Sequence, residues 1–393
     1  MLRSLDLFTG IGGLTHALRG IATPIMYCEP EPTRVNTLTT LMRKGLLPRA
    51  PIHPDVRTIS FTSGTPAIDT STIDPSTVDP STIDPSTIDL VMGGWPCRGW
   101  SVTGKREGFG HEQSALFFEF ARVVNEIKPK FVFQENVPAV VGHAPLTAIA
   151  EALADYDLVW MTLPAYAVGA PHMRRRWYCL GIRRDVTETT LPITAPYDRH
   201  VFMPEPVPRM VDTLHPTARL SMLGNSVVPD AVRLAFLMLF TGFGMPAETL
   251  WASTSVTLAR PPNRKWRLGT QSATRRYGSF IDGAWWRHEI PTQTVPPPPD
   301  FGIELVPFAH PPPETPKAPE ENILHATKPI RMWASPRGAN LGASLILTRR
   351  NSRDLYTQLR FERSTPDTLR AGSPNPEWVE HVMGYPRGWT EMK

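Results

Sequence analysis

The sequence predicts an α/β protein with a mostly parallel sheet and helices on both of its faces. Over residues 2–183, short apolar segments of strand length alternate with longer segments of helical spacing. Glycines or polar side chains directly follow several apolar segments, as at the carboxyl ends of parallel strands, where open α/β sheets bind ligands. The chain has 393 residues and is 41% hydrophobic, which suffices for two or three domains with an apolar core.

The expected elements follow one another along the chain. We expect strands over residues 5–8, 24–28, 88–92, 131–134, 158–163 and 177–182. We expect helices over residues 14–19, 33–43, 113–127, 145–153 and 231–240. The helix over 113–127 has the clearest amphipathic pattern, with apolar side chains at Leu116, Phe117, Phe120, Val123, Val124 and Ile127.

Composition divides the chain into three parts. Residues 1–244 contain the predicted sheet, and within them residues 68–89 repeat a five-residue unit whose prolines exclude a helix or a central strand. We expect this repeat to be an inserted surface loop, the alternative being a docking site or a phosphorylated stalk. Residues 245–330 carry long proline runs and are expected to be a linker or insertion, whereas residues 331–393 regain globular composition as a smaller, irregular region.

The three cysteines, without CxxC spacing, argue against a disulfide scaffold or a structural zinc site. They fit an intracellular, reducing compartment, with nuclear and cytoplasmic locations both open. No apolar run approaches the ~20 residues of a membrane span, and the N-terminus lacks a signal-peptide layout. We therefore expect no membrane partner and no metal, and a monomer.

The net charge of +4 is unevenly distributed. Residues 251–393 hold 19 Lys and Arg against 13 Asp and Glu, and residues 331–370 hold eight Arg, no Lys and three acids. Arginine is favoured where phosphates or guanine edges are recognised. This excess predicts either a nucleic-acid contact or an ordinary solvated surface.

A glycine-rich segment, Asp-Leu-Phe-Thr-Gly-Ile-Gly-Gly at 6–13, follows the first strand and opens a helix. Glycines there permit a close approach of the backbone to a ligand, although the spacing is not the GxGxxG fingerprint. Glu29 follows the second strand, where a carboxylate can accept hydrogen bonds from ribose hydroxyls, and Asp55-Val56 could reach an adenine amino group. Together they favour a nucleoside-bearing cofactor over an ordinary turn and surface acids.

Cys97 follows a buried strand, two glycines and Pro96, whose ring fixes the local backbone. Such a loop can present a nucleophile at the sheet edge, the alternative being a small buried hydrophobe. Glu135 ends the next strand, where burial costs energy unless the carboxylate has a role or an ion-pair partner. Arg174 and Arg176 would share one face and lower the pKa of a nearby cysteine, or else form a solvated basic turn.

Five segments in this order resemble the cytosine-C5 DNA methyltransferases. They are DLFTGIGG (6–13), GGWPC with a later Ser (93–101), ENV (135–137), PHMRRR (171–176) and GNSVVP (224–229). The C-terminal segment 375–390 resembles the one that supports the target-recognition region, and it and WASPR (333–337) are similar to phage and viral members in particular. The resemblance covers about residues 1–245 and the last sixty. It implies a Rossmann-like sheet of the S-adenosylmethionine-dependent methyltransferases, with 331–393 as a target-recognition-like region.

The resemblance also implies residue roles. Cys97 would add to C6 of a flipped cytosine in double-stranded DNA, Glu135 would bond N3 and the exocyclic amine, and Arg176, assisted by Arg174, would orient Glu135. S-adenosyl-L-methionine would be the methyl donor. The residues implied to hold it are Phe8, Gly10, Gly12, Gly13, Glu29, Asp55, Val56, Pro96, Leu116 and Asn225.

Three features depart from the family pattern. Arg98 and His172 stand where the family usually has glutamine, and the GNSV segment precedes residues 331–393 instead of ending the chain. We infer a rearranged recognition module. Two alternatives stay open: a catalytically inactive DNA-binding or regulatory relative, and an RNA cytosine-C5 methyltransferase.

Overall fold

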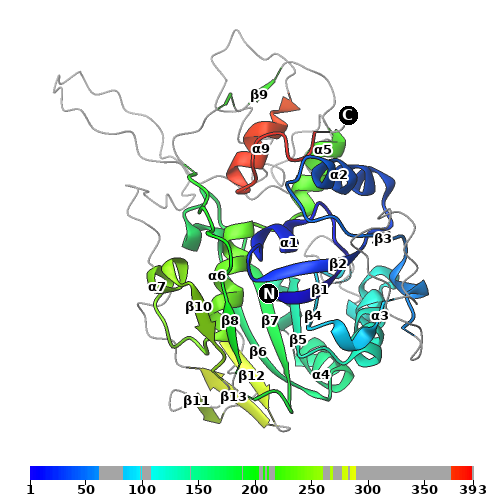
Figure 1. The fold of residues 1–393 in the computed structure, drawn as a ribbon, viewed down its shortest axis with the longest axis vertical. Helices are drawn as coiled ribbons and strands as arrows, with labels where there is room; N and C mark the ends of the chain where they lie inside the picture. Colours follow the sequence, from blue (N-terminus) through cyan, green and yellow to red (C-terminus); the bar gives the residue numbers. More distant parts are fainter. Residues whose placement is uncertain are drawn as a thin grey trace, which may run out of the picture.

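The computed structural model describes residues 1–61, 83–97, 99, 108–141, 143–187, 189–202, 207–208, 210–211, 217–259, 266–268, 277–281, 284–288 and 373–391. Within these residues the main element is a ten-stranded sheet in the order β11-β13-β12-β6-β7-β5-β4-β1-β2-β3 (Figure 1). The repeat at 68–82, Arg98, Ser101 and residues 331–372 of the predicted recognition region lie outside the described residues.

The central strands form the parallel part of the sheet. They are β1 (Leu2–Leu7), β2 (Ala22–Cys28), β3 (Ile52–His53), β4 (Leu90–Gly93) and β5 (Phe131–Asn136). Strand β7 (Arg176–Arg183) inserts antiparallel between β5 and β6 (Tyr156–Leu163). The prediction of a mostly parallel central sheet is confirmed, and each predicted strand is present with ends shifted by a few residues.

Two hydrophobic cores lie on opposite faces of the sheet. One packs helices α1 (Gly13–Ala17), α2 (Pro32–Arg43) and α6 (Pro229–Phe240) against Met92 and Phe133. The other packs α3 (Glu112–Ile127) and α4 (His143–Ala152) against Val91 and Val132. Successive strand residues point to opposite faces, so the continuous apolar runs of β4 and β5 serve both cores, and the predicted helices on both faces are confirmed.

Part of the range expected to be a linker or insertion is folded. Helix α7 (Ala247–Ala252) and strands β10 (Ser255–Thr257), β11 (Trp266–Leu268), β12 (Tyr277–Ile281) and β13 (Ala284–His288) lie within residues 245–330. Strand β12 pairs antiparallel with β6, and β10 pairs with β8 (Thr190–Pro192). The aromatic strand segments therefore extend the sheet, while the proline runs lie outside the described residues.

Residues 373–391, the last that the structure describes, pack against elements of residues 1–244. Strand β14 (Ser373–Pro374) pairs with β9 (Met210–Val211), and helix α9 (Pro376–Val382) lies beside α5 (Thr217–Asn225) (Figure 1). Trp378, Val382 and Trp389 belong to the same hydrophobic core as α6. Residues 373–391 thus complete the core of the sheet domain. The sequence suggested that this region could fold back over the catalytic domain, but composition assigned it to a separate region.

Residues Ala218–Phe240 reach the length and apolar composition of a membrane span, and 89% of that window is buried inside the protein. The structure divides it into α5 and α6, with Ser226 to Val228 between them. Burial against the sheet is the pattern of core helices, so this window is weak evidence for a membrane span.

Candidate active site

The strand register brings the predicted site segments to one edge of the sheet. Leu7 pairs with Gly93, Gly93 pairs with Gln134, and Asn136 pairs with Trp177. The carboxyl ends of β1, β4 and β5 and the start of β7 therefore meet at the same edge, as is typical of ligand sites in α/β sheets. The candidate site is built where these segments meet.

Strand β5 fixes the loop that carries Cys97. The Trp95 indole nitrogen donates to Gln134 Oε1 at 3.2 Å, and Asn136 Nδ2 donates to the Trp95 carbonyl at 2.9 Å. Cys97 itself is a half-buried free thiol. A cysteine whose supporting loop is bonded to the neighbouring strand has the placement expected of a positioned nucleophile.

Glu135 and Arg176 form an ion pair beside this loop, with Glu135 Oε1 3.0 Å from Arg176 Nε. Gly94 makes room for the carboxylate, since a Cβ at this position would lie 3.1 Å from Glu135 Oε2. Burial raises the pKa of Glu135, while the nearby charges of Arg176 and Arg174 oppose that rise. The ion pair holds the charged carboxylate in the free protein, while burial makes protonation of Glu135 easier than in water.

The Cys97 thiol responds to the same charges. Burial raises the pKa of Cys97, the negative charge of Glu135 raises it further, and Arg176 and Arg174 lower it. Cys97, Glu135, Arg174 and Arg176 therefore form one electrostatic cluster. Without a ligand, the balance keeps Cys97 predominantly as the thiol at neutral pH.

Arg174 also links two segments of the fold through hydrogen bonds. Its guanidinium donates to the Gly224 carbonyl at 3.1 and 3.2 Å from its two terminal nitrogens and also to the Ser226 carbonyl. Burial and the positive charge of Arg176 together lower the pKa of Arg174 to about 9. Arg174 thus joins the Gly-Asn-Ser segment at 224–226 to the start of β7.

We expect Arg174→Met to lower the free energy of unfolding by about 2–3 kcal/mol, because it leaves buried carbonyls without their donor. Urea denaturation followed by circular dichroism measures the change. Arg175→Met, at the half-exposed neighbouring position, is the control and should change it by less than about 0.5 kcal/mol. Equal effects of the two variants would contradict the structural role of Arg174.

The glycine-rich turn after β1 adopts the backbone that its sequence suggests. Phe8, Gly10 and Gly12 have φ of 56°, 62° and 79°, in the left-handed region that glycine adopts without strain. Thr15 Oγ1 donates to Asp6 Oδ2 at 2.7 Å, and burial raises the pKa of Asp6 to about 7. The turn is thereby held against the end of β1.

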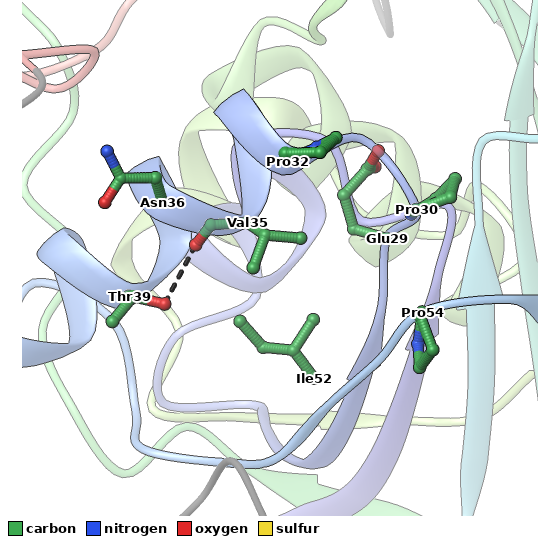
Figure 2. A pocket seen from close by; sticks show the side chains of 8 residues that line it. All are labelled: Glu29, Pro30, Pro32, Val35, Asn36, Thr39, Ile52 and Pro54. Carbon is green, nitrogen blue, oxygen red and sulfur yellow. Dashed lines mark hydrogen bonds between the residues drawn. The ribbon is translucent and has the colours of Figure 1, made fainter.

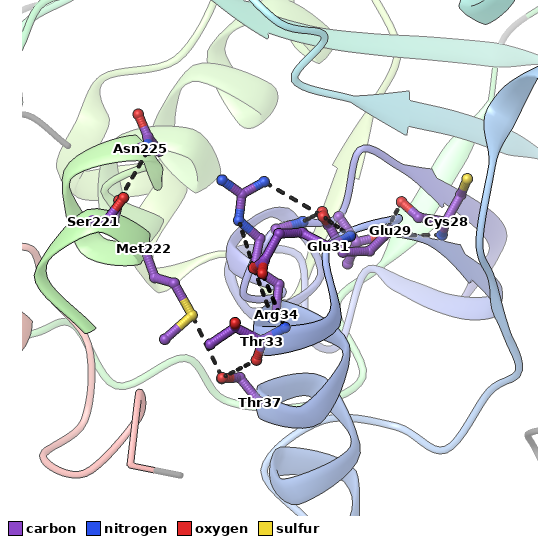
Figure 3. A network of polar contacts seen from close by, with 11 residues as sticks. Cys28, Glu29, Glu31, Thr33, Arg34, Thr37, Ser221, Met222 and Asn225 are labelled. Carbon is purple, nitrogen blue, oxygen red and sulfur yellow. Dashed lines mark hydrogen bonds and ion pairs between the residues drawn. The ribbon is translucent and has the colours of Figure 1, made fainter. Parts of the chain in front are cut away.

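Glu29 is 1% exposed and is held at the end of β2 (Figure 3). Its Oε2 accepts from the Gly10 backbone N–H at 2.8 Å, and its Oε1 accepts from the Glu31 N–H at 3.1 Å. Arg34 Nη1 lies 3.4 Å from Oε1, and this charge opposes the rise that burial causes in the pKa of Glu29. A carboxylate has about four acceptor positions, so Glu29 retains capacity for a ligand hydroxyl.

The other predicted cofactor residues differ in their surroundings. Phe8, Val56 and Leu116 contribute to one hydrophobic cluster, and Pro96 is half-buried. The Asp55 carboxylate accepts from Arg57, with Oδ2 2.7 Å from Arg57 Nη2. Asn225 is exposed at the end of α5, where its Nδ2 donates to the Ser221 carbonyl at 3.0 Å (Figure 3).

His172, one of the departures from the family pattern, is fully buried. One ring nitrogen lies 2.9 Å from the Val382 carbonyl of α9, and burial lowers the pKa of His172 to about 3. The neutral ring therefore connects the segment before β7 to the C-terminal helix. Its place in the structure is a packing contact.

The sequence did not indicate a role for Arg34, nor for Glu380, Tyr385 and Trp389 within the C-terminal segment. Arg34 carries only a weak signal, a basic side chain in the first turn of α2, which begins at Pro32 shortly after Glu29. The C-terminal residues lie more than 300 positions from the glycine-rich turn, and local periodicity carries no information about such contacts.

A surface hollow lies between α2 and β3 (Figure 2). Its lining is mostly apolar: Glu29, Pro30, Pro32, Val35, Asn36, Thr39, Ile52 and Pro54. These residues come from the segments around β2, α2 and β3 and not from the Cys97 and Glu135 segments, so the hollow is distinct from the candidate site at the ends of β4 and β5. Within the described part of the chain, no group of three or more His, Cys, Asp or Glu could hold a metal ion.

Comparison with known proteins gives a family match over residues 2–214, to the model described as C-5 cytosine-specific DNA methylase. The type II methyltransferase M.CviJI of Paramecium bursaria Chlorella virus IL3A is 31% identical over 256 residues, covering 64% of this chain and 62% of the relative. M.HhaI of Haemophilus parahaemolyticus is 32% identical over 119 residues, covering 29% of this chain and 36% of the relative. The chain thus spans less than two thirds of the length of these relatives.

Among solved structures, the chain is similar to the S. pombe Dnmt2 methyltransferase, with a TM-score of 0.34 and 20% identity over 48% of this chain and 52% of that one. A putative DNA modification methyltransferase from an E. coli prophage has the same TM-score at 25% identity, covering 48% of this chain and 49% of that one.

Proposed function

Because this chain belongs to the C-5 cytosine-specific DNA methylase family, we propose that it transfers a methyl group from S-adenosyl-L-methionine to C5 of a cytosine flipped out of double-stranded DNA. Cys97 forms the transient covalent bond to the base. The observation that carries this proposal is the Glu135–Arg176 ion pair, at 3.0 Å, beside the loop of a half-buried free cysteine.

The roles follow from the chemistry of these side chains. The Cys97 thiolate adds to C6 of the base, forming the Sγ–C6 bond and making C5 nucleophilic. Glu135, protonated, donates to N3 and so stabilises the negative charge that develops on the ring, while Arg176 holds its carboxyl in place. Once C5 carries the methyl group, the C5 proton is lost to water, the C5–C6 double bond re-forms, and the Sγ–C6 bond breaks to return the Cys97 thiolate.

The residues at the ends of β1 and β2 fit the methyl donor. S-adenosylmethionine, when bound, supplies an electrophilic methyl group. Glu29 would hold the ribose, and Gly10, where a Cβ would meet nothing closer than 4.0 Å, would admit the ligand close to the chain. Gly12 and Gly13 would shape the turn, since protein side chains fill the space beside them. Phe8 would stack on the adenine and Asp55 would bond its amino group, with Val56, Pro96, Leu116 and Asn225 completing the pocket.

Methyl transfer from tritiated S-adenosylmethionine to mixed-sequence duplex DNA tests the proposal. We expect label on C5 of cytosine, and sequencing of the product would then give the target site. Absence of label on DNA, with measurable cofactor binding, would contradict it. An RNA substrate in parallel then separates an RNA methyltransferase from an inactive DNA-binding relative.

A second prediction concerns the charge around Cys97. Because Glu135 raises the pKa of Cys97, Glu135→Gln should lower that pKa and increase the thiolate fraction at pH 8. Alkylation by iodoacetamide should then be several-fold faster in the variant, although methyl transfer falls. Intact-protein mass spectrometry measures the rate.

Cys97→Ser identifies the signal in this experiment, because burial raises the pKa of both Cys28 and Cys179 and makes them poor reactants. The alkylation rate should rise with pH for the wild type and for Glu135→Gln, with the midpoint of Glu135→Gln at lower pH. An unchanged or higher midpoint in Glu135→Gln would show that the carboxylate does not act on the thiol.

A further inference from the structure

The C-terminal segment, residues 373–391, contacts the glycine-rich turn at residues 8–13. The Trp389 indole nitrogen donates to the Ile11 carbonyl at 2.9 Å, across 378 positions of sequence. Trp389 is 1% exposed, and its ring lies 4.5 Å from that of His16 on α1, centroid to centroid. A buried donor from the far end of the chain thus bonds the middle of the turn.

A second contact reaches the same turn. Gly13 leaves no room for a side chain, because a Cβ there would lie 2.4 Å from the Tyr385 hydroxyl and 2.6 Å from Val227 Cγ2. Tyr385 is buried, and its ring lies 5.3 Å from that of Trp389. The C-terminal segment and the Gly-Asn-Ser-Val segment therefore both pack against the first turn of α1.

Glu380 holds the turn that carries Trp389. This carboxylate is fully buried and accepts from the backbone N–H groups of Gly388 and Thr390, both at 2.7 Å. Arg219 of α5 donates to it at 3.0 Å. These bonds fix the backbone on both sides of Trp389, at Gly388 and Thr390. The indole of Trp389 therefore presents its N–H to Ile11 in one orientation.

We propose that Trp389 is a positioning residue for the methyl donor. It acts through Ile11 to hold the glycine-rich turn in the left-handed conformation that approaches the ligand. This inference rests on the proposed function, in which residues 8–13 bind S-adenosylmethionine. Ordering a mobile loop on binding costs free energy and so lowers the affinity for the ligand, whereas a loop that is already fixed in the binding conformation avoids this cost.

The test compares Trp389→Phe with Trp378→Phe in the full chain. Both residues are buried in the same core, but Trp378 lies on α9 and not on the turn that bonds Ile11. Trp389→Phe keeps an aromatic ring in the core and removes the N–H together with part of the indole, and Trp378→Phe removes the same ring atoms from a buried site without touching the bond to Ile11. Isothermal titration with S-adenosylhomocysteine measures affinity, and hydrogen exchange of the amides of residues 9–13, without ligand, measures the turn itself.

We expect Trp389→Phe to raise the Kd about five- to tenfold, as for the loss of one buried hydrogen bond, and to speed exchange in the turn. Trp378→Phe should leave both close to wild type. The KM for S-adenosylmethionine should rise with kcat at saturation unchanged, which a general loss of stability would not produce.

Unchanged exchange and Kd in Trp389→Phe would overturn the inference, as would equal changes in the two variants. If the wild type binds no S-adenosylhomocysteine, the proposed function fails. The exchange data then still show whether Trp389 holds the turn, so the two failures are distinguishable.

Discussion

Cys97→Ser is expected to lower methyl transfer to DNA by on the order of 10⁴-fold or more, as is usual when a covalent nucleophile is removed. A serine hydroxyl at this position has no adjacent general base among the described residues, since Glu135 is paired with Arg176. Tritiated methyl incorporation under saturating donor measures the loss.

The same variant should keep its fold and its affinity for the donor, because Cys97 is only half-buried and does not lie in the turn at 8–13. Thermal unfolding and titration with S-adenosylhomocysteine provide these controls. Methyl transfer within tenfold of wild type, in a folded variant, would exclude Cys97 as the nucleophile.

Glu380→Ala is expected to lower the free energy of unfolding by about 3 kcal/mol. The change leaves the buried Thr390 N–H and the part-buried Gly388 N–H without an acceptor and removes the partner of Arg219. Urea denaturation followed by tryptophan fluorescence measures it, because Trp378 and Trp389 lie in the affected segment.

Glu377→Ala is the matched control on the same helix. Glu377 pairs with Arg387, whose side chain is 68% exposed, and surface pairs of this kind contribute at most about 1 kcal/mol. A comparable loss in both variants would show that burial of Glu380 is not what stabilises the C-terminal segment.

The sequence was sufficient to predict the central sheet and its helices. Strands β5 and β6 contain short, uninterrupted apolar runs, and the helix over Glu112–Ile127 has a clear amphipathic pattern, so their type and order follow from local periodicity. The ends moved by a few residues because caps such as that of Glu31 on α2 depend on side-chain bonds.

The sequence also placed the site segments, since parallel strands present their carboxyl ends at one edge. It could not show that Arg176 reaches Glu135 at 3.0 Å, that Arg174 bonds the Gly224 carbonyl or that Asp55 pairs with Arg57. These contacts depend on tertiary packing, so the catalytic and cofactor roles remain predictions.

The C-terminal segment was the least predictable part. Proline-rich composition suggested a linker before it, and no pattern in residues 373–391 indicates that Trp389 bonds Ile11. The contact between the two segments depends on complementary shape, because Gly13 leaves the space that Tyr385 fills. Such pairs become visible only when both segments are placed.

Trapping of the covalent adduct tests the central claim most directly. In duplex DNA with 5-fluorocytosine at the target position, fluorine replaces the C5 proton whose loss releases Cys97, so the Sγ–C6 bond should persist after methyl transfer. Intact-mass analysis of denatured samples is expected to show protein joined to one DNA strand, with peptide mapping to Cys97 and no adduct in Cys97→Ser. Methylated cytosine DNA in the parallel reaction, with no trapped adduct on the fluorinated DNA, would contradict the covalent mechanism.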